Sequence, residues 1–251
     1  MKHFLYCFLL FSAVLMSCSD KYVIKGSSSH DIGGGEVAYL KVTDGANHTA
    51  IDSCRIVHGR FEMSGEIDSV MCVSFFMGNQ EGFPLVLEYG DINIDMSETF
   101  VKIGGTPLND KLYHYLHKRD SMLLEMEVLH FAERDLLFSG YAPSEARKMV
   151  AKQRSEIQGC IDDLNARFVV DNYDNVLGVT WFLRMCNEAT MRHGFPTTTT
   201  QIDQIFHSAP DEFKHNPGIV KFMQQVEEAI FKRVPTTRRP VDRNLYNAGF
   251  E

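Results

Sequence analysis

The stretch Ile92–Leu112, INIDMSETFVKIGGTPLNDKL, contains the change of hydrophobic period that decides the fold. Residues 92–96 alternate apolar and polar side chains, which is the two-residue period of a half-buried strand. From Leu108 onward the apolar residues recur at helical spacing instead. Thr106 and Pro107 suit the N-cap and the first helical position, where a backbone donor is not needed. The sequence therefore predicts strands up to residue 105 and helices from residue 106.

Short strands are expected before this junction, at intervals of roughly 8–12 residues. The expected strands are 22–24, 36–42, 49–57, 60–64, 70–77, 83–88 and 92–96. This spacing is typical of an antiparallel β-sandwich-like domain or a partly closed barrel. The glycine run at 33–35 precedes a strand rather than a helix, so it predicts a hairpin loop and not a phosphate site.

Helical stripes and capping residues organise the chain after the junction. The expected helices start at Thr106, Ser144, Val176, Ile202 and Asn216, and Gly194 suits the C-cap of the third. The expected fold class is therefore α+β, an antiparallel β-sandwich-like domain followed by an α-helical bundle domain. The expected divisions are a signal peptide at 1–17, the β domain at 18–105, the helical domain at 106–232 and an irregular basic tail at 233–251.

The composition indicates a folded, acidic protein. Of 251 residues, 44% are hydrophobic, which is enough for a buried core. Acidic residues number 33 against 25 basic ones, a formal net charge of −8. This balance gives no electrostatic support for nucleic-acid binding.

The N-terminus has the features of a lipoprotein signal peptide. Lys2 precedes the apolar run Phe4–Met16, which is shorter than the ~20 residues that a membrane-spanning helix needs. Ser17-Cys18 follows and resembles the lipobox of bacterial lipoproteins, which implies cleavage before Cys18 and lipidation of its sulfur. An ordinary signal peptide is the alternative. Ser19 resembles residues that permit transfer to the outer membrane, so we expect an outer-membrane lipoprotein that faces the periplasm.

Several short motifs of the first half resemble a family of domains of unknown function, of the DUF4369 type. The residues that carry the resemblance are Asp52-Ser53, Val57, Gly59, Phe61, Leu87-Glu88-Tyr89-Gly90-Asp91-Ile92, Gly105-Thr106 and Asn109. In lipoproteins of Gram-negative gut anaerobes this domain precedes a thioredoxin-like domain, which we do not find in the present sequence. The resemblance covers about residues 21–110 and implies an architecture, because the family has no established reaction.

The cysteines lack the spacing of a redox pair or a zinc finger. Apart from Cys7 and Cys18, the chain has Cys54, Cys72, Cys160 and Cys186, which allow three pairings. Cys54 and Cys72 both fall in expected strands and could form a disulfide. Free buried thiols are the alternative for all four.

One helix face carries three potential metal ligands. Asp110, His114 and His117 are spaced so that they share a face of the expected helix and could bind zinc. A polar, solvated helix face is the preferred interpretation. We find no nucleophile elbow, His-Glu-x-x-His motif or phosphate-binding loop, so neither catalytic residues nor a cofactor is expected.

These features favour a lipid-anchored protein that acts as a non-catalytic accessory or binding module. Its expected partners are the membrane, through the lipid, and another periplasmic protein. One alternative is a partner or regulator of a thioredoxin-like oxidoreductase supplied in trans. The other is an enzyme whose site a single sequence does not reveal.

Overall fold

The computed structural model describes residues 21–28, 36–44, 47–78, 82–97 and 100–233. These residues belong to two compact units, one up to Phe168 and the other from Val169. The expected signal peptide, Cys18 and residues 234–251 of the expected basic tail lie outside the described residues.

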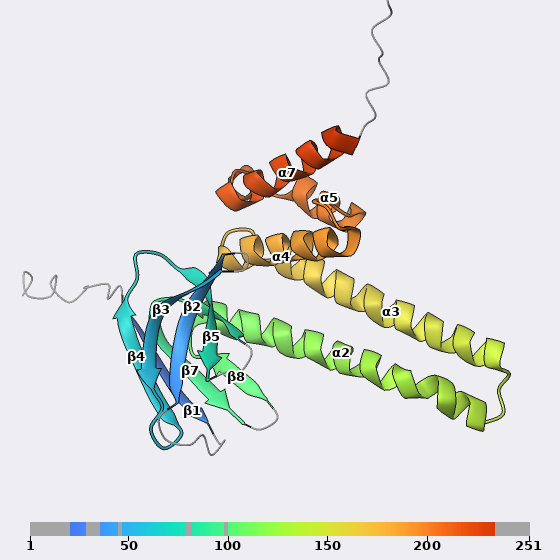
Figure 1. Ribbon diagram of the computed structural model, residues 1–251, viewed down its shortest axis with the longest axis horizontal. Helices are drawn as coiled ribbons and strands as arrows, with labels where there is room; N and C mark the ends of the chain where they lie inside the picture. Colours follow the sequence, from blue (N-terminus) through green and yellow to red (C-terminus); the bar gives the residue numbers. More distant parts are fainter. Residues whose placement is uncertain (1–20, 29–35, 45–46, 79–81, 98–99, 234–251) are drawn as a thin grey trace, which may run out of the picture. The chain divides into compact units, whose positions relative to one another are not determined.

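The first unit begins with strands that form two sheets (Figure 1). The strands are β1 (Lys21–Ser28), β2 (Val37–Asp44), β3 (Asn47–Arg55), β4 (Arg60–Glu66), β5 (Met71–Met77), β6 (Phe83–Leu87), β7 (Gly90–Met96) and β8 (Val101–Gly104). Among the described strands, one sheet has the order β4-β1-β7-β8 and the other the order β3-β2-β5-β6. Helices follow from Pro107. The predicted α+β fold, with sheets first and helices after, is confirmed.

The two sheets share one hydrophobic core. In β5 the residues Val73, Phe75 and Met77 are buried, and the residues between them are only half-buried. In β7 the buried residues Ile92 and Ile94 are likewise flanked by exposed polar ones. This alternation is the reason that a period of two in the sequence predicted strands.

One strand pair departs from the expected antiparallel pattern. β1 and β7 pair in parallel, with Tyr22 opposite Gly90 and Ser28 opposite Met96, whereas the other described pairs are antiparallel. Parallel neighbours require a crossover connection. The whole second sheet and β4 lie between β1 and β7 in the sequence, so no hairpin constrains their direction. β8 was not predicted, because four residues are too few to establish a period.

Two long antiparallel helices complete the first unit (Figure 1). They are α2 (Pro107–Phe138) and α3 (Pro143–Val170), which starts one residue before the expected Ser144. Near the sheets, the Tyr115 ring stacks on the Phe168 ring with centroids 4.0 Å apart. Farther along the hairpin, Arg147 Nε lies 3.3 Å from Glu133 Oε1. Gly140, with a φ of +90°, lies in the turn that joins the two helices.

The second unit consists of helices. They are α4 (Val176–His193), α5 (Thr200–Ser208), α6 (Asp211–Lys214), which was not predicted, and α7 (Pro217–Arg233). Gly194 has the left-handed conformation at the end of α4, with a φ of +77°, as its predicted C-cap role requires. Phe182 and Phe213 are fully or nearly fully buried and meet edge to face. Gly178 lies so close to the Asn172 carbonyl that there is no space for a Cβ atom.

Among the described helices, none combines the length and the hydrophobicity that a membrane span requires.

Candidate functional site

Three residues of the family resemblance, Glu88, Thr106 and Asn109, come together where the sheets meet the start of α2. Asn109 is fully buried, and its side-chain amide is saturated with hydrogen bonds. Its Nδ2 donates to Val86 O at 2.7 Å and to Thr106 Oγ1 at 2.9 Å, and its Oδ1 accepts from Val86 N at 2.9 Å. The Asn109 amide therefore binds the backbone of β6 as a neighbouring strand would.

Glu88 supplies the N-terminal cap of α2. Its Oε1 accepts from Leu108 N at 2.9 Å, from Asn109 N at 3.0 Å and from Asn109 Nδ2 at 3.2 Å. Two free N–H groups of the first helical turn are thereby satisfied, and the carboxylate lies at the positive end of the helix dipole. Thr106 occupies the predicted N-cap position, but its side chain makes no capping bond. We call Val86, Glu88, Thr106 and Asn109 the sheet–helix joint.

Asp52, another residue of the family resemblance, connects the two sheets. The Tyr22 hydroxyl, on β1, donates to Asp52 Oδ2, on β3 of the other sheet, at 2.6 Å. Burial, together with this hydrogen bond to a carboxylate, raises the pKa of Tyr22 far above its usual value. Gly65 faces Tyr22 in the register, and a Cβ there would lie 2.8 Å from the tyrosine oxygen. The Tyr22–Asp52 pair therefore links the two sheets.

The three potential metal ligands do not converge. Asp110 Oδ1 accepts a hydrogen bond from Gly105 N at 3.0 Å, so this carboxylate belongs to the turn that precedes α2. His114 and His117 are exposed on the helix surface. In the described part of the chain, no group of three or more His, Cys, Asp or Glu side chains is placed to hold a metal ion.

None of the four described cysteines, Cys54, Cys72, Cys160 and Cys186, forms a disulfide. Cys54 lies on β3 and Cys72 on β5, with β2 between them in the sheet. Two strand spacings amount to roughly 9–10 Å, whereas the Cα atoms of a disulfide lie about 4–7 Å apart. Cys54 and Cys72 therefore do not form the disulfide that the sequence left open, because β2 separates their strands in the sheet.

The thiols are expected to differ sharply in reactivity. Cys160 is exposed, whereas Cys186 is fully buried, and burial raises the pKa of Cys186 to about 12. Since the thiolate is the reactive form, iodoacetamide at pH 8 should alkylate Cys160 at least ~1000-fold faster than Cys186. Mass spectrometry of individual peptides measures the two rates separately. Equal rates in the folded protein would contradict this prediction, and equal rates in 6 M guanidinium are the control.

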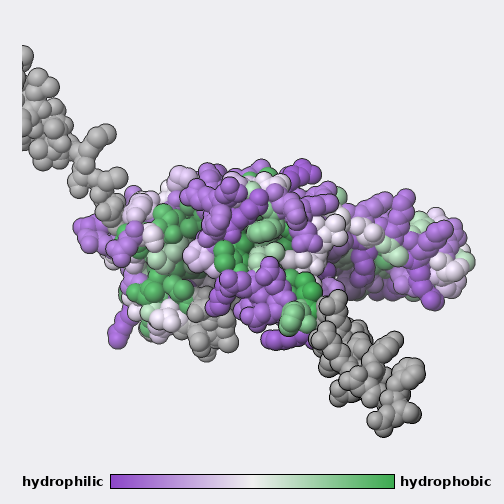
Figure 2. Space-filling view, turned by 90° about the horizontal axis from the view of Figure 1, so that it is seen from above, coloured by the Kyte–Doolittle hydropathy of each residue, from purple (hydrophilic) through white to green (hydrophobic). Residues whose placement is uncertain are grey.

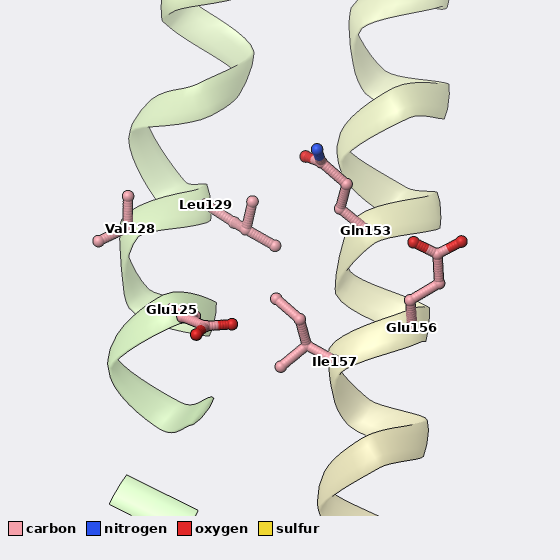
Figure 3. A pocket seen from close by; sticks show the side chains of 6 residues that line it. All are labelled: Glu125, Val128, Leu129, Gln153, Glu156 and Ile157. Carbon is pink, nitrogen blue, oxygen red and sulfur yellow. The ribbon is translucent and has the colours of Figure 1, made fainter. Parts of the chain in front are cut away.

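A groove runs between α2 and α3 (Figure 3). Its volume is about 340 Å³, and its lining residues are Glu125, Val128, Leu129, Gln153, Glu156 and Ile157. Leu129 and Ile157 point toward each other across it, whereas Val128 points to the side away from α3 (Figure 3). The lining offers neither a nucleophile paired with a base nor converging charges of one sign. Apolar side chains with scattered polar ones suit contact with another helix better than chemistry on a small molecule.

Comparison with known proteins identifies the first part of the chain. A family model described as Domain of unknown function (DUF4369) matches residues 22–112. No curated protein and no solved structure matches the chain. The matched region contains all eight described strands except the first residue of β1, and it ends at the fully buried Leu112 in α2. The sheet–helix joint thus lies inside the match, and residues 22–112 are similar to the DUF4369 family of domains of unknown function.

Proposed function

We propose that this protein is a lipid-anchored component of the bacterial cell envelope that acts as a non-catalytic accessory or binding module. The lipid on Cys18 attaches it to the outer membrane on the periplasmic side. The two folded units then present surfaces to another protein rather than an active site to a substrate.

One observation carries this proposal. Three of the polar residues by which the sequence resembles its family make hydrogen bonds within the fold: Glu88 and Asn109 connect the end of β6 to α2, and Asp52 accepts from the Tyr22 hydroxyl. Ser53 and Asp91 of the same set are exposed. Among the described residues, no buried side-chain nitrogen or oxygen lacks a hydrogen-bond partner. A catalytic site commonly keeps polar groups unpaired until the substrate binds, whereas the buried polar side chains of the described residues are already hydrogen-bonded. It supports a domain whose motif maintains a scaffold.

The anchor has a direct test in the chain itself. Cys18→Ala should move the protein from the membrane fraction to the soluble or unprocessed fraction, because the thioether that carries the acyl chains needs the thiol. Cys7→Ala is the matched control, since Cys7 lies within the expected signal peptide, and it should leave membrane attachment unchanged. Mass spectrometry of the mature N-terminus should find an acylated Cys18. An unmodified N-terminus at Ser19, an intact Met1, or a membrane-bound Cys18→Ala variant would contradict the proposal.

The accessory role is tested on the purified protein. Turnover of a thiol, glycan or peptide substrate by the purified chain would show an enzyme and overturn the proposal. Recovery of one envelope protein after cross-linking in intact cells, lost when the anchor is removed, is the result that we expect.

A further inference from the structure

Helix α2 carries two heptad stripes on opposite faces. The inner stripe is Tyr115, Arg119, Met122, Met126, Leu129, Glu133 and Leu136, and each of these residues is buried or half-buried. The outer stripe is His117, Ser121, Leu124, Val128, Phe131, Asp135 and Phe138, and each of these residues is exposed. In both stripes successive residues are alternately three and four positions apart, which is the spacing by which one helix packs along another.

The inner stripe is occupied by α3. Leu129 and Ile157 point toward each other between the helices (Figure 3), and Glu133 forms an ion pair with Arg147. The inner stripe of α2 therefore packs against a helix, which is α3 of the same hairpin. The outer stripe has the same spacing and begins and ends within two residues of the inner one.

The outer stripe exposes large apolar side chains. Leu124 is 63% exposed, Val128 60%, Phe131 57% and Phe138 84%. Figure 2, which views the hairpin from the α3 side, shows a mostly hydrophilic surface there with some hydrophobic patches. With the neighbouring Leu123, these side chains expose on the order of 500 Å² of apolar surface, which is near the upper range for a monomer. It is also a large share of the roughly 800 Å² that each partner buries in a stable dimer.

The outer half of the hairpin has a small core, in which Ala146 and Val150 of α3 are the buried residues of the described chain. Every residue from Leu116 to Glu145 is at least partly exposed. Two helices with so few buried side chains between them are marginally stable in water, because most helical stability comes from packing of an apolar face. A helix that is apolar on two opposite sides is normally covered on both.

We propose that the outer stripe of α2 packs antiparallel against the outer stripe of a second copy of this chain, so that two hairpins form a four-helix bundle. The two-fold axis passes near residue 126. Leu124 then lies opposite Val128 of the second copy, and Phe131 lies opposite Ser121 of the second copy. A hollow of about 520 Å³ beside the stripe, lined by Asp120, Leu123, Leu124, Met126, Glu127 and His130, receives side chains of the second copy.

Charge complementarity selects this register. Asp135 at one end of the stripe meets His117 of the second copy, and Asp120 at the edge meets Arg134 of the second copy. A shift by one heptad would instead place the Asp135 carboxylate, which lies 3.2 Å from the Arg134 guanidinium of its own chain, against the apolar Leu124 of the second copy, where burial of this ion pair gains no new polar contact. The antiparallel register that places the apolar side chains of the two copies opposite each other therefore also places acidic residues opposite basic ones.

The test compares two exposed phenylalanines on the full-length protein in detergent. Sedimentation equilibrium should give a dimer for the unmodified chain. Phe131→Asp should weaken dimerisation at least ~100-fold, because the change occurs twice in each dimer. Phe100→Asp is the control, because Phe100 is 56% exposed but lies outside the stripe, and it should not change the dissociation constant. Circular dichroism should show the same helix content for Phe100→Asp as for the unmodified chain.

A second variant tests the register. The two copies of Glu127 come close beside the axis and repel each other, so Glu127→Gln should tighten the dimer by about threefold or more. A chain that stays monomeric at 100 µM would overturn the proposal, as would a dimer that Phe131→Asp leaves intact. A third outcome would also overturn the proposal: the unmodified chain is a monomer, and Phe131→Asp has a lower helix content. This outcome would show that the outer stripe is covered by another part of the same chain.

Discussion

Asn109→Ala is expected to lower the free energy of unfolding of the first unit by about 3 kcal/mol. The side chain is fully buried and makes hydrogen bonds to both backbone groups of Val86, to Thr106 and to Glu88. Alanine would leave the Val86 N–H and C=O buried without these partners, and an unsatisfied buried group costs more than the bond itself contributes. Because the joint connects β6 to α2, the start of the helix should loosen first.

Chemical unfolding in urea, followed by circular dichroism, measures this loss. Gln158→Ala is the control, because Gln158 is an exposed amide on α3 that donates to Asp162 at 2.8 Å. Its removal should change stability by no more than about 0.5 kcal/mol. Similar losses for the two variants would show that the joint does not hold the sheets and the helix together.

Phe75→Ala is expected to destabilise the sandwich by about 3–5 kcal/mol. Phe75 is fully buried on β5, and its ring stacks on Phe61 of β4, in the other sheet, with centroids 5.1 Å apart. Alanine removes the ring, so it leaves a cavity at the contact between the sheets in addition to the lost transfer energy.

The adjacent residue is the matched control for the core. Phe76 lies on the same strand with its side chain on the other face, half-buried, and Lys41 Nζ lies 4.5 Å from its ring centroid. Phe76→Ala should cost about 1–2 kcal/mol. Phe75→Leu, at about 1–1.5 kcal/mol, gives a folded variant if Phe75→Ala does not fold. Equal losses at positions 75 and 76 would contradict the assignment of the core face.

Local signals in the sequence predicted most of the elements. Thr106-Pro107 marked the start of α2 and Gly194 the end of α4, because caps and breakers act through the backbone within one turn. The alternation in residues 92–96 predicted β7 for a similar reason, since burial of one strand face is visible as a period of two. The short elements β8 and α6 were missed, because four residues do not establish a period.

The sequence by itself therefore determined the order of strands and helices and the point where one gives way to the other. The tertiary structure decided which elements meet. The parallel pairing of β1 with β7, the β2 strand between Cys54 and Cys72, and the contact of Asn109 with Val86 all join residues far apart in the chain. Caps and hydrophobic periods depend on neighbours within a few residues, whereas these contacts depend on how whole sheets and helices pack, and no local pattern records that.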